Sequence, residues 1–373
     1  MRARASEPSV SAQLPDFPWD KLTAYAATAR AHPDGIVDLS VGTPVDPTPE
    51  VAQVALREAA DSPGYPLTIG LPHARQAAVD WLARKHGVTG LGIDQVLPVI
   101  GSKELIASLP THLGIGAGDL VVHPELAYPT YEVGTVLAGA RTRATDSLTA
   151  LGPEVPRLVW INSPSNPTGR VLPKEHLKKV VDWCRERGVL LVSDECYIEC
   201  GWETDACSVL HPDVSGDSHE GILAVHSLSK RSNLAGYRCA FVAGDRAVVA
   251  ELLAVRKNLG LQMPGPQQRV MAAVLADDRH SEEQHARYAA RRARLKVALE
   301  RAGFTIEHSE ASLYLWATRG EPCWDTVAAL AEVGVLVAPG EFYGPAGARH
   351  VRIAFTATDE RVVAAAARLS ALR

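Results

Sequence analysis

Lys230 directly follows the apolar run I-L-A-V-H-S-L-S at residues 222–229. A lysine at the end of a buried strand has restricted access to bulk water, and desolvation or a nearby cation disfavours its ammonium form. An amine in that condition is a nucleophile suited to Schiff-base chemistry with a carbonyl compound. The alternative is a surface lysine that opens a loop, and position alone does not decide between the two.

Polar side chains follow two other apolar runs. Asp194 closes the run G-V-L-L-V-S-D-E at residues 188–195, where a carboxylate could pair with a cation, bind a metal or cap the next helix. Asn162 and Asn166 lie in N-S-P-S-N-P-T-G (162–169), whose prolines and glycine favour an irregular loop. These asparagines could bind a ligand or satisfy the backbone of the loop.

A candidate anion site opens the predicted helix after Q-V-L-P-V-I, at Gly101-Ser102-Lys103-Glu104. Backbone N–H groups at such a helix N-terminus suit a phosphate. Arg238 would supply a cationic fork for the same phosphate. The alternative is an ordinary serine N-cap with a glutamate in the first turn.

Short apolar runs alternate with helical patterns through most of the chain. Such runs, rich in β-branched residues, predict strands buried on both faces and hence a largely parallel sheet. The predicted strands are residues 119–124, 157–164, 188–195, 222–229 and 239–245, and the predicted helices are residues 21–32, 102–113, 173–187 and 246–258. Ligands bind at the carboxyl ends of strands in open α/β sheets. We therefore expect the polar residues above to converge on one site.

The last third of the chain has a different pattern. A charged amphipathic stretch at about 267–302 predicts a helix that leaves the sheet domain, and three segments after it predict strands of a second, α+β domain, at 305–317, 334–340 and 350–355. We expect an N-terminal arm and small-domain segment at 1–45, a large domain at 46–262 and a small C-terminal domain at 263–373.

The motifs together resemble those of the class I/II aminotransferases, which are pyridoxal-phosphate enzymes with the aspartate-aminotransferase fold. The matching segments are N-P-T-G (166–169), D-E-C-Y (194–197), S-L-S-K (227–230) and G-Y-R (236–238), within a resemblance that runs from D-L-S-V-G-T-P (38–44) to V-R-I-A-F (351–355). The resemblance implies fold type I of these enzymes, an α/β fold with a mainly parallel central sheet and a smaller α+β C-terminal domain.

The resemblance implies a role for each candidate residue. Lys230 would hold pyridoxal 5′-phosphate as a Schiff base and then move a proton between the substrate Cα and the cofactor C4′. Asp194 would pair with the pyridine nitrogen, so that the ring accepts electrons from the substrate. Arg352 would pair with the substrate α-carboxylate, helped by the Gly42 backbone and Asn166.

The remaining implied contacts are with the cofactor and with a second subunit. Expected cofactor contacts are the phosphate ligands Ser102, Lys103 (through its backbone N–H), Ser227 and Arg238, the phenolic-oxygen ligands Asn166 and Tyr197, the ring-stacking Tyr128, and Ser229. Tyr65 would reach the phosphate of the neighbouring subunit, which implies a homodimer.

The substrate class is suggested by longer matches. S-L-S-K-R-S-N-L-A-G-Y-R (227–238), with V-I-G-S-K-E and S-P-S-N-P-T-G, looks like the succinyldiaminopimelate aminotransferases of bacterial lysine synthesis. That likeness implies transfer of the amino group of N-succinyl-LL-2,6-diaminopimelate to 2-oxoglutarate. The alternatives are prephenate, aspartate or aromatic amino acids as substrates, β-elimination or decarboxylation on the same cofactor, and a ligand sensor without catalysis.

Two features depart from the family pattern. Family members usually have glycine two residues after the phosphate arginine, where this chain has Ala240 after Cys239. Alanine is small, so we expect a slight adjustment only. The N-terminal arm is longer than the minimal pattern, and the sequence assigns it no role.

Composition limits the other functions. The chain of 373 residues is 46% hydrophobic and 22% charged, which excludes collagen-like, mucin-like and wholly disordered proteins. The net charge of −5 provides no basic field for nucleic acid, and no apolar run approaches the roughly 20 residues that cross a bilayer. The N-terminus lacks the apolar core of a secretory signal. We expect a cytoplasmic enzyme acting on small amino and 2-oxo acids, with no nucleic-acid or membrane partner.

The cysteines give little sign of a metal site. Cys196, Cys200 and Cys207 cluster, but their spacing matches no closed zinc pattern. We expect reduced, mostly buried thiols and no metal.

Overall fold

A seven-stranded sheet organises the larger part of the chain, of which the computed structural model describes residues 9–372. Its strand order is β2-β8-β7-β6-β5-β3-β4, and β8 alone runs antiparallel to its neighbours. The strands are β2 (Val96–Val99), β3 (Leu120–His123), β4 (Arg141–Ala144), β5 (Leu158–Asn162), β6 (Leu190–Asp194), β7 (Ile222–Ser227) and β8 (Ala240–Gly244). Strands β5, β7 and β8 are buried along their whole length, as their continuous apolar runs predict. The predicted, mostly parallel sheet is confirmed.

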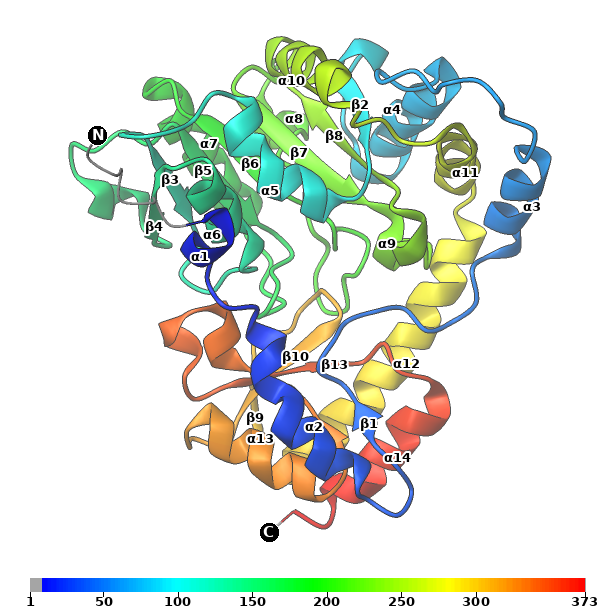
Figure 1. Cartoon of the computed structure of the whole chain (residues 1–373), viewed down its shortest axis with the longest axis vertical. Coiled ribbons are helices and arrows are strands. Elements are labelled where there is room, and N and C mark those ends of the chain that lie inside the picture. Colours follow the sequence, from blue (N-terminus) through cyan, green and yellow to red (C-terminus); the bar gives the residue numbers. More distant parts are fainter. Residues whose placement is uncertain (1–8, 373) are drawn as a thin grey trace, which may run out of the picture.

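Helices cover both faces of this sheet (Figure 1). One face packs against helices that include α3 (Glu50–Glu58), α4 (Pro72–His86), α7 (Lys174–Glu186), α8 (Pro212–Ser215) and α11 (Gly265–Ala276). The other face packs against α5 (Ser102–His112), α6 (Thr130–Leu137) and α10 (Arg246–Leu259). Successive residues of a strand point to opposite faces of the sheet. Val122 packs in the core that contains α4 and α7, and Val121 packs in the core that contains α5 and α6. The result is a three-layer α/β arrangement.

A smaller α+β part lies in the lower half of Figure 1. Its strands are β1 (Val37–Asp38) paired with β11 (Val335–Leu336), and an antiparallel sheet β12-β13-β10-β9 made of β9 (Thr305–Glu307), β10 (Tyr314–Thr318), β12 (Ala338–Pro339) and β13 (Val351–Ala354). Its helices are α2 (Thr23–Arg30), α12 (Arg279–Arg301), α13 (Cys323–Glu332) and α14 (Asp359–Leu369). The N-terminal segment returns to this part, because Leu22, Ala26 and Val37 share its core with the C-terminal strands.

The remaining described elements are short. They are α1 (Val10–Gln13), η1 (Pro18–Leu22), η2 (Ile93–Gln95), η3 (Leu148–Leu151), α9 (Leu228–Arg231), η4 (Ala235–Tyr237), η5 (Gly340–Tyr343) and η6 (Pro345–Gly347).

The prediction of one continuous helix at 267–302 is wrong, although the segment is largely helical. The stretch forms two helices, α11 and α12, because Asp277 has an extended conformation and its Oδ1 accepts a hydrogen bond from Arg279 N at 2.8 Å. An aspartate side chain that accepts from the backbone N–H two residues further on favours a turn over a continued helix. Segment 305–317 is likewise interrupted between β9 and β10, where His308 and Ser309 have positive φ.

The helix α11 packs against α3 and α4, with Val270 and Met271 in the core of the large sheet. The helix α12 then runs from the upper to the lower half of the molecule (Figure 1). The division at residue 262 stays a prediction. No helix between residues 9 and 372 is long and apolar enough to cross a membrane.

Candidate active site

Three neighbouring strands end in polar residues at the same edge of the large sheet. Asn162 ends β5 and is paired in register with Asp194, which ends β6, and Ser227 ends β7. The chain then turns into the short helix α9, which carries Lys230. The convergence expected from the sequence is therefore present at the carboxyl ends of the strands.

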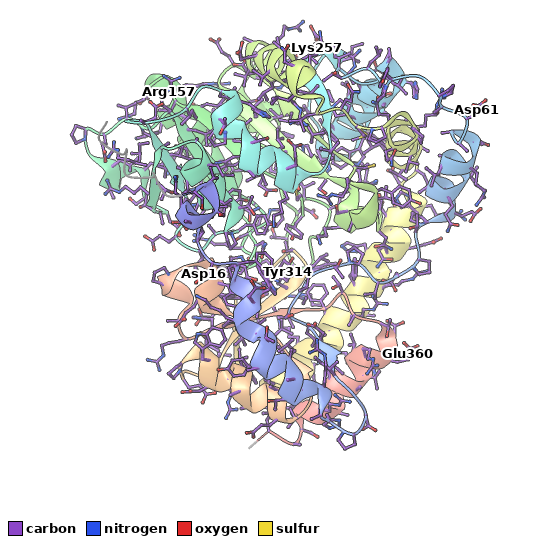
Figure 2. All side chains as sticks on the ribbon, in the orientation of Figure 1. Asp16, Asp61, Arg157, Lys257, Tyr314 and Glu360 are labelled. Atoms are coloured by element: carbon purple, nitrogen blue, oxygen red, sulfur yellow. The ribbon has the colours of Figure 1, made fainter. Side chains whose placement is uncertain are left out.

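A cavity of about 460 Å³ opens at this edge. It is lined by all of the residues expected in the site except Tyr65, namely Gly42, Ser102, Lys103, Tyr128, Asn166, Asp194, Tyr197, Ser227, Ser229, Lys230, Arg238 and Arg352. Tyr314, which also lines it, lies between the upper and lower halves of the molecule in Figure 2. Tyr65 is 98% exposed and does not line this cavity.

The start of α5 forms an anion-binding corner with Arg238. Gly101 has φ 94°, and a Cβ there would overlap the Arg238 guanidinium, so only glycine permits this close approach. Ser102 begins the helix, whose free N–H groups favour an anion. The helix is fixed from its first turn by Glu104, which accepts two hydrogen bonds of 2.9 Å from the fully buried Arg256.

Asp194 is a buried carboxylate that lacks a cationic partner in the described part of the chain. Its Oδ2 accepts a hydrogen bond from Tyr131 Oη at 2.8 Å, and its Oδ1 accepts one from Cys196 N at 3.1 Å. Burial raises the pKa of Asp194, against the lowering effect of these hydrogen bonds. A cation placed beside Asp194 would favour its charged form.

Asn162 organises the loop that follows β5. Its Nδ2 donates to Asp194 O at 2.9 Å and to Pro164 O at 3.1 Å, while its Oδ1 accepts from Asn166 N at 2.7 Å. The loop therefore presents Asn166 to the cavity in one fixed position.

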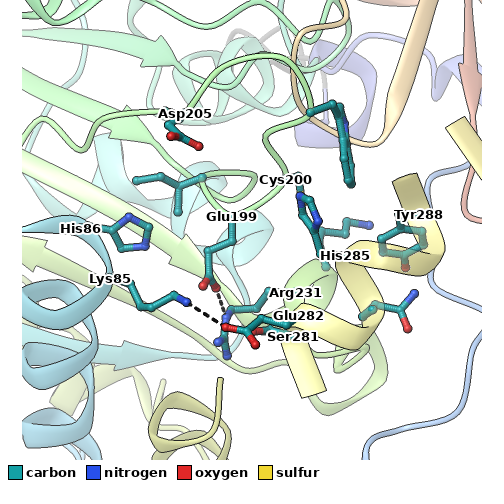
Figure 3. A pocket seen from close by; sticks show the side chains of 15 residues that line it. Lys85, His86, Glu199, Cys200, Asp205, Arg231, Ser281, Glu282, His285 and Tyr288 are labelled. Carbon is teal, nitrogen blue, oxygen red and sulfur yellow. Dashed lines mark hydrogen bonds and ion pairs between the residues drawn. The ribbon is translucent and has the colours of Figure 1, made fainter. Parts of the chain in front are cut away.

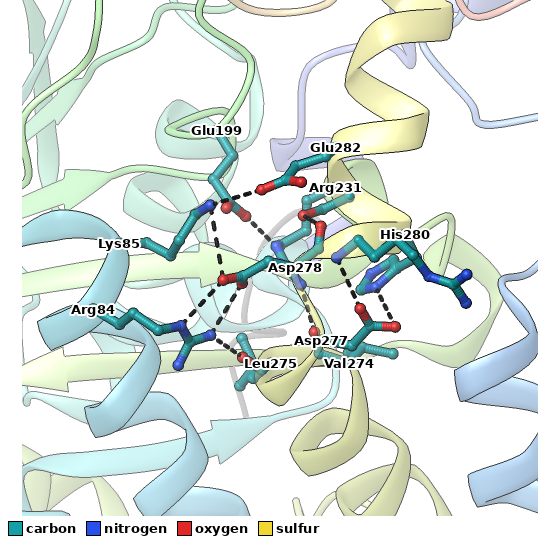
Figure 4. Close-up of polar contacts among 12 residues, drawn as sticks. Arg84, Lys85, Glu199, Arg231, Val274, Leu275, Asp277, Asp278, His280 and Glu282 are labelled. Carbon is teal, nitrogen blue, oxygen red and sulfur yellow. Dashed lines mark hydrogen bonds and ion pairs between the residues drawn. The ribbon is translucent and has the colours of Figure 1, made fainter.

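Lys230 Nζ donates a hydrogen bond to Gly42 O, which joins the N-terminal segment to α9. Gly42 packs so closely against Tyr314 that a Cβ would overlap the tyrosine ring. The neighbouring Arg231 holds α9 in place: it forms an ion pair with Glu199, and its Nη1 donates to Val274 O at 3.0 Å (Figure 4). A second cavity of about 440 Å³, seen in Figure 3, also reaches Lys230 and contains this ion pair.

Arg352 is a buried cation that lines the first cavity. Its Nη1 donates to Asn166 Oδ1 at 2.8 Å and its Nη2 to Ser40 O at 2.7 Å, whereas its Nε has no partner among residues 9–372. Its guanidinium lies 3.9 Å from the ring centroid of Tyr314 and 4.8 Å from that of Tyr343. Burial opposes the charge, but the tyrosine hydroxyls outweigh it and raise the pKa of Arg352.

Two tyrosines next to Arg352 share a hydrogen bond of 2.9 Å between their hydroxyl groups, Tyr197 and Tyr314. Burial raises the pKa of Tyr197. For Tyr314 burial acts in the same direction, but the cations Arg352 and Lys230 outweigh it and lower the pKa. Either hydroxyl can be the donor of this hydrogen bond.

Several functional neighbours were missed from the sequence. Tyr131 supports Asp194, and Tyr314 and Tyr343 flank Arg352, but none stands in a motif at a strand end. A signal existed only for Tyr131, since it lies one helical turn after Tyr128 in A-Y-P-T-Y. The clustered cysteines Cys196, Cys200 and Cys207 are free thiols.

Comparison with known proteins gives the family. Residues 34–369 match the family model described as aminotransferase class I and II. The chain belongs to this family. Its members depend on pyridoxal 5′-phosphate, and the enzyme transfers amino groups between amino and 2-oxo acids. Elimination, decarboxylation and a non-catalytic sensor are therefore set aside.

Three relatives show how far the likeness extends. The aminotransferase is 62% identical to a probable aminotransferase of Mycobacterium tuberculosis, over 97% of this chain and 86% of that protein. It is 58% identical to the 4-dedimethylamino-4-oxo-anhydrotetracycline transaminase of Streptomyces rimosus. This match covers 96% of this chain and 99% of that protein. A solved structure of a probable N-succinyldiaminopimelate aminotransferase from Thermus thermophilus superposes with a TM-score of 0.85 at 29% identity. The superposition covers 95% of this chain and 100% of that chain.

The donor set of the cavity fits the cofactor. One cavity contains a cationic corner suited to a phosphate, at Ser102 and Arg238, and the amine of Lys230. The same cavity contains the carboxylate of Asp194, which lacks a cationic partner among the described residues. These are the groups that a ring bearing a phosphate, a basic nitrogen and an aldehyde requires.

Proposed function

We propose that this aminotransferase moves the amino group of N-succinyl-LL-2,6-diaminopimelate to 2-oxoglutarate, giving N-succinyl-2-amino-6-oxopimelate and glutamate. The observation that carries the proposal is Arg352, a buried cation whose Nε lacks a protein partner, among the described residues, in the cavity of Lys230 and Asp194. A buried cation with free donor capacity calls for an anion, and both amino acids carry an α-carboxylate. The likeness to the Thermus thermophilus enzyme supports the succinylated substrate.

The residues of the site then take the following roles. Ser102, Lys103 N, Ser227 and Arg238 would bind the phosphate, and Ser229 would also contact the cofactor. Tyr128 would cover the ring, and Asn166 and Tyr197 would bind its phenolic oxygen. When bound, pyridoxal 5′-phosphate accepts the electron pair left on the substrate Cα and carries the amino group between the two substrates.

The chain's own groups position the substrate and move its proton. Arg352 binds the α-carboxylate and so places the Cα–H bond within reach of Lys230 Nζ, which takes the proton. Asp194, held by Tyr131 and Cys196 N, would pair with the ring nitrogen and favour the protonated form of that nitrogen. Two half-reactions that share one site give ping-pong kinetics.

Covalent labelling tests the role of Lys230. Borohydride should fix the cofactor to the peptide that contains Lys230, and Lys230→Ala should lose at least the roughly 10²–10⁴-fold that a positioned proton-transfer group contributes. Label on Lys103 or Lys257 instead would contradict the assignment.

The substrate is tested by comparing kcat/KM for the succinylated substrate with the values for aspartate, aromatic amino acids and prephenate. If prephenate or an aromatic acceptor is preferred by more than about tenfold, or about 1.4 kcal/mol of transition-state binding, the proposed substrate is wrong. The aminotransferase activity would be unaffected by that outcome.

A second candidate is amination of a ring ketone. The Streptomyces rimosus relative, named for an oxo-anhydrotetracycline, is 58% identical, and the cavity has aromatic walls formed by Phe17, Trp19 and Tyr128. Glutamate-dependent conversion of such a ketone, with a higher kcat/KM than the succinylated substrate, would favour this candidate.

We also propose a homodimer in which Tyr65 reaches the phosphate of the neighbouring subunit. Its exposed position, next to the half-exposed Leu67, is suited to an interface between two copies.

A further inference from the structure

Lys103 is an exposed cation that lines the cavity shared by Lys230 and Arg352. Its Nζ lies 5.7 Å from the ring centroid of Phe17 and 5.9 Å from that of Tyr128. No carboxylate of residues 9–372 forms an ion pair with it. Two aromatic rings favour a cation at this point, and they leave its N–H donors available to a ligand.

An unbroken series of aromatic rings connects Lys103 to Arg352. The ring centroids of Phe17 and Trp19 are 5.6 Å apart, and those of Trp19 and Tyr343 are 6.5 Å apart. Tyr343 in turn lies 4.8 Å from the Arg352 guanidinium. The cavity is therefore lined by the rings of Phe17 and Trp19 together with a buried cation, Arg352, and an exposed cation, Lys103.

The N-terminal arm supplies Phe17 and Trp19 to this lining. Phe17 and Trp19 lie at the start of η1, and Trp19 is anchored by Phe342, with ring centroids 5.4 Å apart. The arm runs in Figure 1 from α1, near the upper half, down to α2 in the lower half. It brings Phe17 of the arm against Lys103 of α5, so one wall joins the two parts of the molecule.

We propose that Lys103 is the subsite for the distal carboxylate of a long dicarboxylic amino acid, and that Phe17 and Trp19 line the path of its methylene chain. The inference rests on the proposed function, because it takes the α-carboxylate to lie on Arg352. A substrate bound in this way meets a cation at each end and an apolar surface between them.

Two amino acids of equal length test the inference: 2-aminopimelate, which has a distal carboxylate, and 2-aminoheptanoate, which has a methyl group there. The measured quantity is the ratio of their kcat/KM values. Lys103→Met should lower this ratio by about 10- to 100-fold, mainly by raising KM for the dicarboxylate, because the contact is made in the ground state and the transition state alike. Lys103→Arg should keep most of the ratio, because it keeps the charge.

The ratio separates substrate recognition from cofactor binding. Any change that the substitution makes at the phosphate corner affects both substrates and cancels. The matched control is Lys257→Met, since Lys257 is an exposed lysine on α10 that lies at the far end of the molecule from Tyr314 (Figure 2). Its ratio should equal that of the wild type.

The two possible failures are distinguishable. A wild-type ratio near one, or a ratio that survives Lys103→Met, overturns the subsite. If the wild type rejects N-succinyl-LL-2,6-diaminopimelate while its preference for 2-aminopimelate depends on Lys103, the subsite stands and the proposed substrate is wrong.

Discussion

Arg352 combines a fixed position with unused hydrogen-bonding capacity. Its two Nη groups are held by Asn166 and Ser40, its Nε has no partner among residues 9–372, and the residue lines the first cavity. Arg352→Lys keeps the charge but loses the fork, so kcat/KM should fall by roughly 10- to 150-fold, the equivalent of about 1.5–3 kcal/mol for a charge-assisted pair. The loss should be similar for every amino donor, since all share the α-carboxylate. A loss confined to one donor would place Arg352 in the side-chain pocket instead.

Asp194 is a buried carboxylate that Tyr131 and Cys196 N hold in position for its proposed role beside the ring nitrogen. Asp194→Ala should leave the fold intact, weaken cofactor binding and slow the proton-transfer step most, because the ring nitrogen loses its anionic partner. Tyr131→Phe removes only one hydrogen bond to Asp194, so it should cause a smaller loss and shift the pH dependence of kcat. Spectroscopic titration of the bound cofactor and single-turnover rates measure both effects. Near wild-type turnover in Asp194→Ala would contradict this role.

Glu195 makes stability depend on pH. Its Oε1 accepts from Val209 N at 2.8 Å, its Oε2 lies 3.5 Å from His226 Nε2, and burial raises the pKa of Glu195 to about 7 from an ordinary value of 4.5. Between these values the folded carboxyl is protonated and the unfolded one is ionised, so the contribution of Glu195 to stability declines as pH rises from 4.5 to 7. Relative to Glu195→Gln, the wild type should lose about 3 kcal/mol over this range. Urea unfolding of both proteins at several pH values measures the difference, and parallel curves would contradict the raised pKa.

At the scale of elements, α9 is too short to be stable without tertiary contacts. Arg231 attaches it to Glu199, to Val274 O and to the face of Trp81, whose ring centroid is 5.6 Å from the guanidinium. Arg231→Met leaves the mostly buried Glu199 charge unpaired and should cost about 3–5 kcal/mol of unfolding free energy. The double variant Arg231→Met/Glu199→Gln should recover part of that loss. Equal stability of the single and double variants would show that the ion pair does not hold α9.

For the whole molecule, the proposed homodimer predicts that Tyr65, which is exposed in a single copy, completes the site of the second copy. In solution the chain should have twice the mass of one copy. Tyr65→Ala and Lys230→Ala should each be weakly active or inactive alone, because one lacks the phosphate contact and the other the amine. Mixed after dissociation, they should regain about a quarter of the wild-type sites, since each mixed dimer contains one intact site. No recovery in a mixture shown to contain mixed dimers would contradict the shared site.

Much of the fold and of the site is encoded locally. The apolar runs before Asn162, Asp194 and Ser227 determine buried strands, and parallel strands bring their carboxyl ends to one edge. Lys230 follows from the same pattern, because it stands just after the end of β7. Local propensity and the chain order are enough for these residues, and the family motifs lie on them.

The surroundings that give those residues their properties were decided only by tertiary structure. These contacts join segments that lie far apart in the chain or carry no motif. They are Tyr131 with Asp194, Tyr314 and Tyr343 with Arg352, and Phe17 with Lys103. Sequence spacing carries no information about which faces of two elements meet, because packing of complete side chains selects those faces. The sequence by itself therefore determined the chemical groups and the sheet edge where they gather, while the packing of the arm and the smaller part onto that edge decided their partners, their burial and the shape of the cavity.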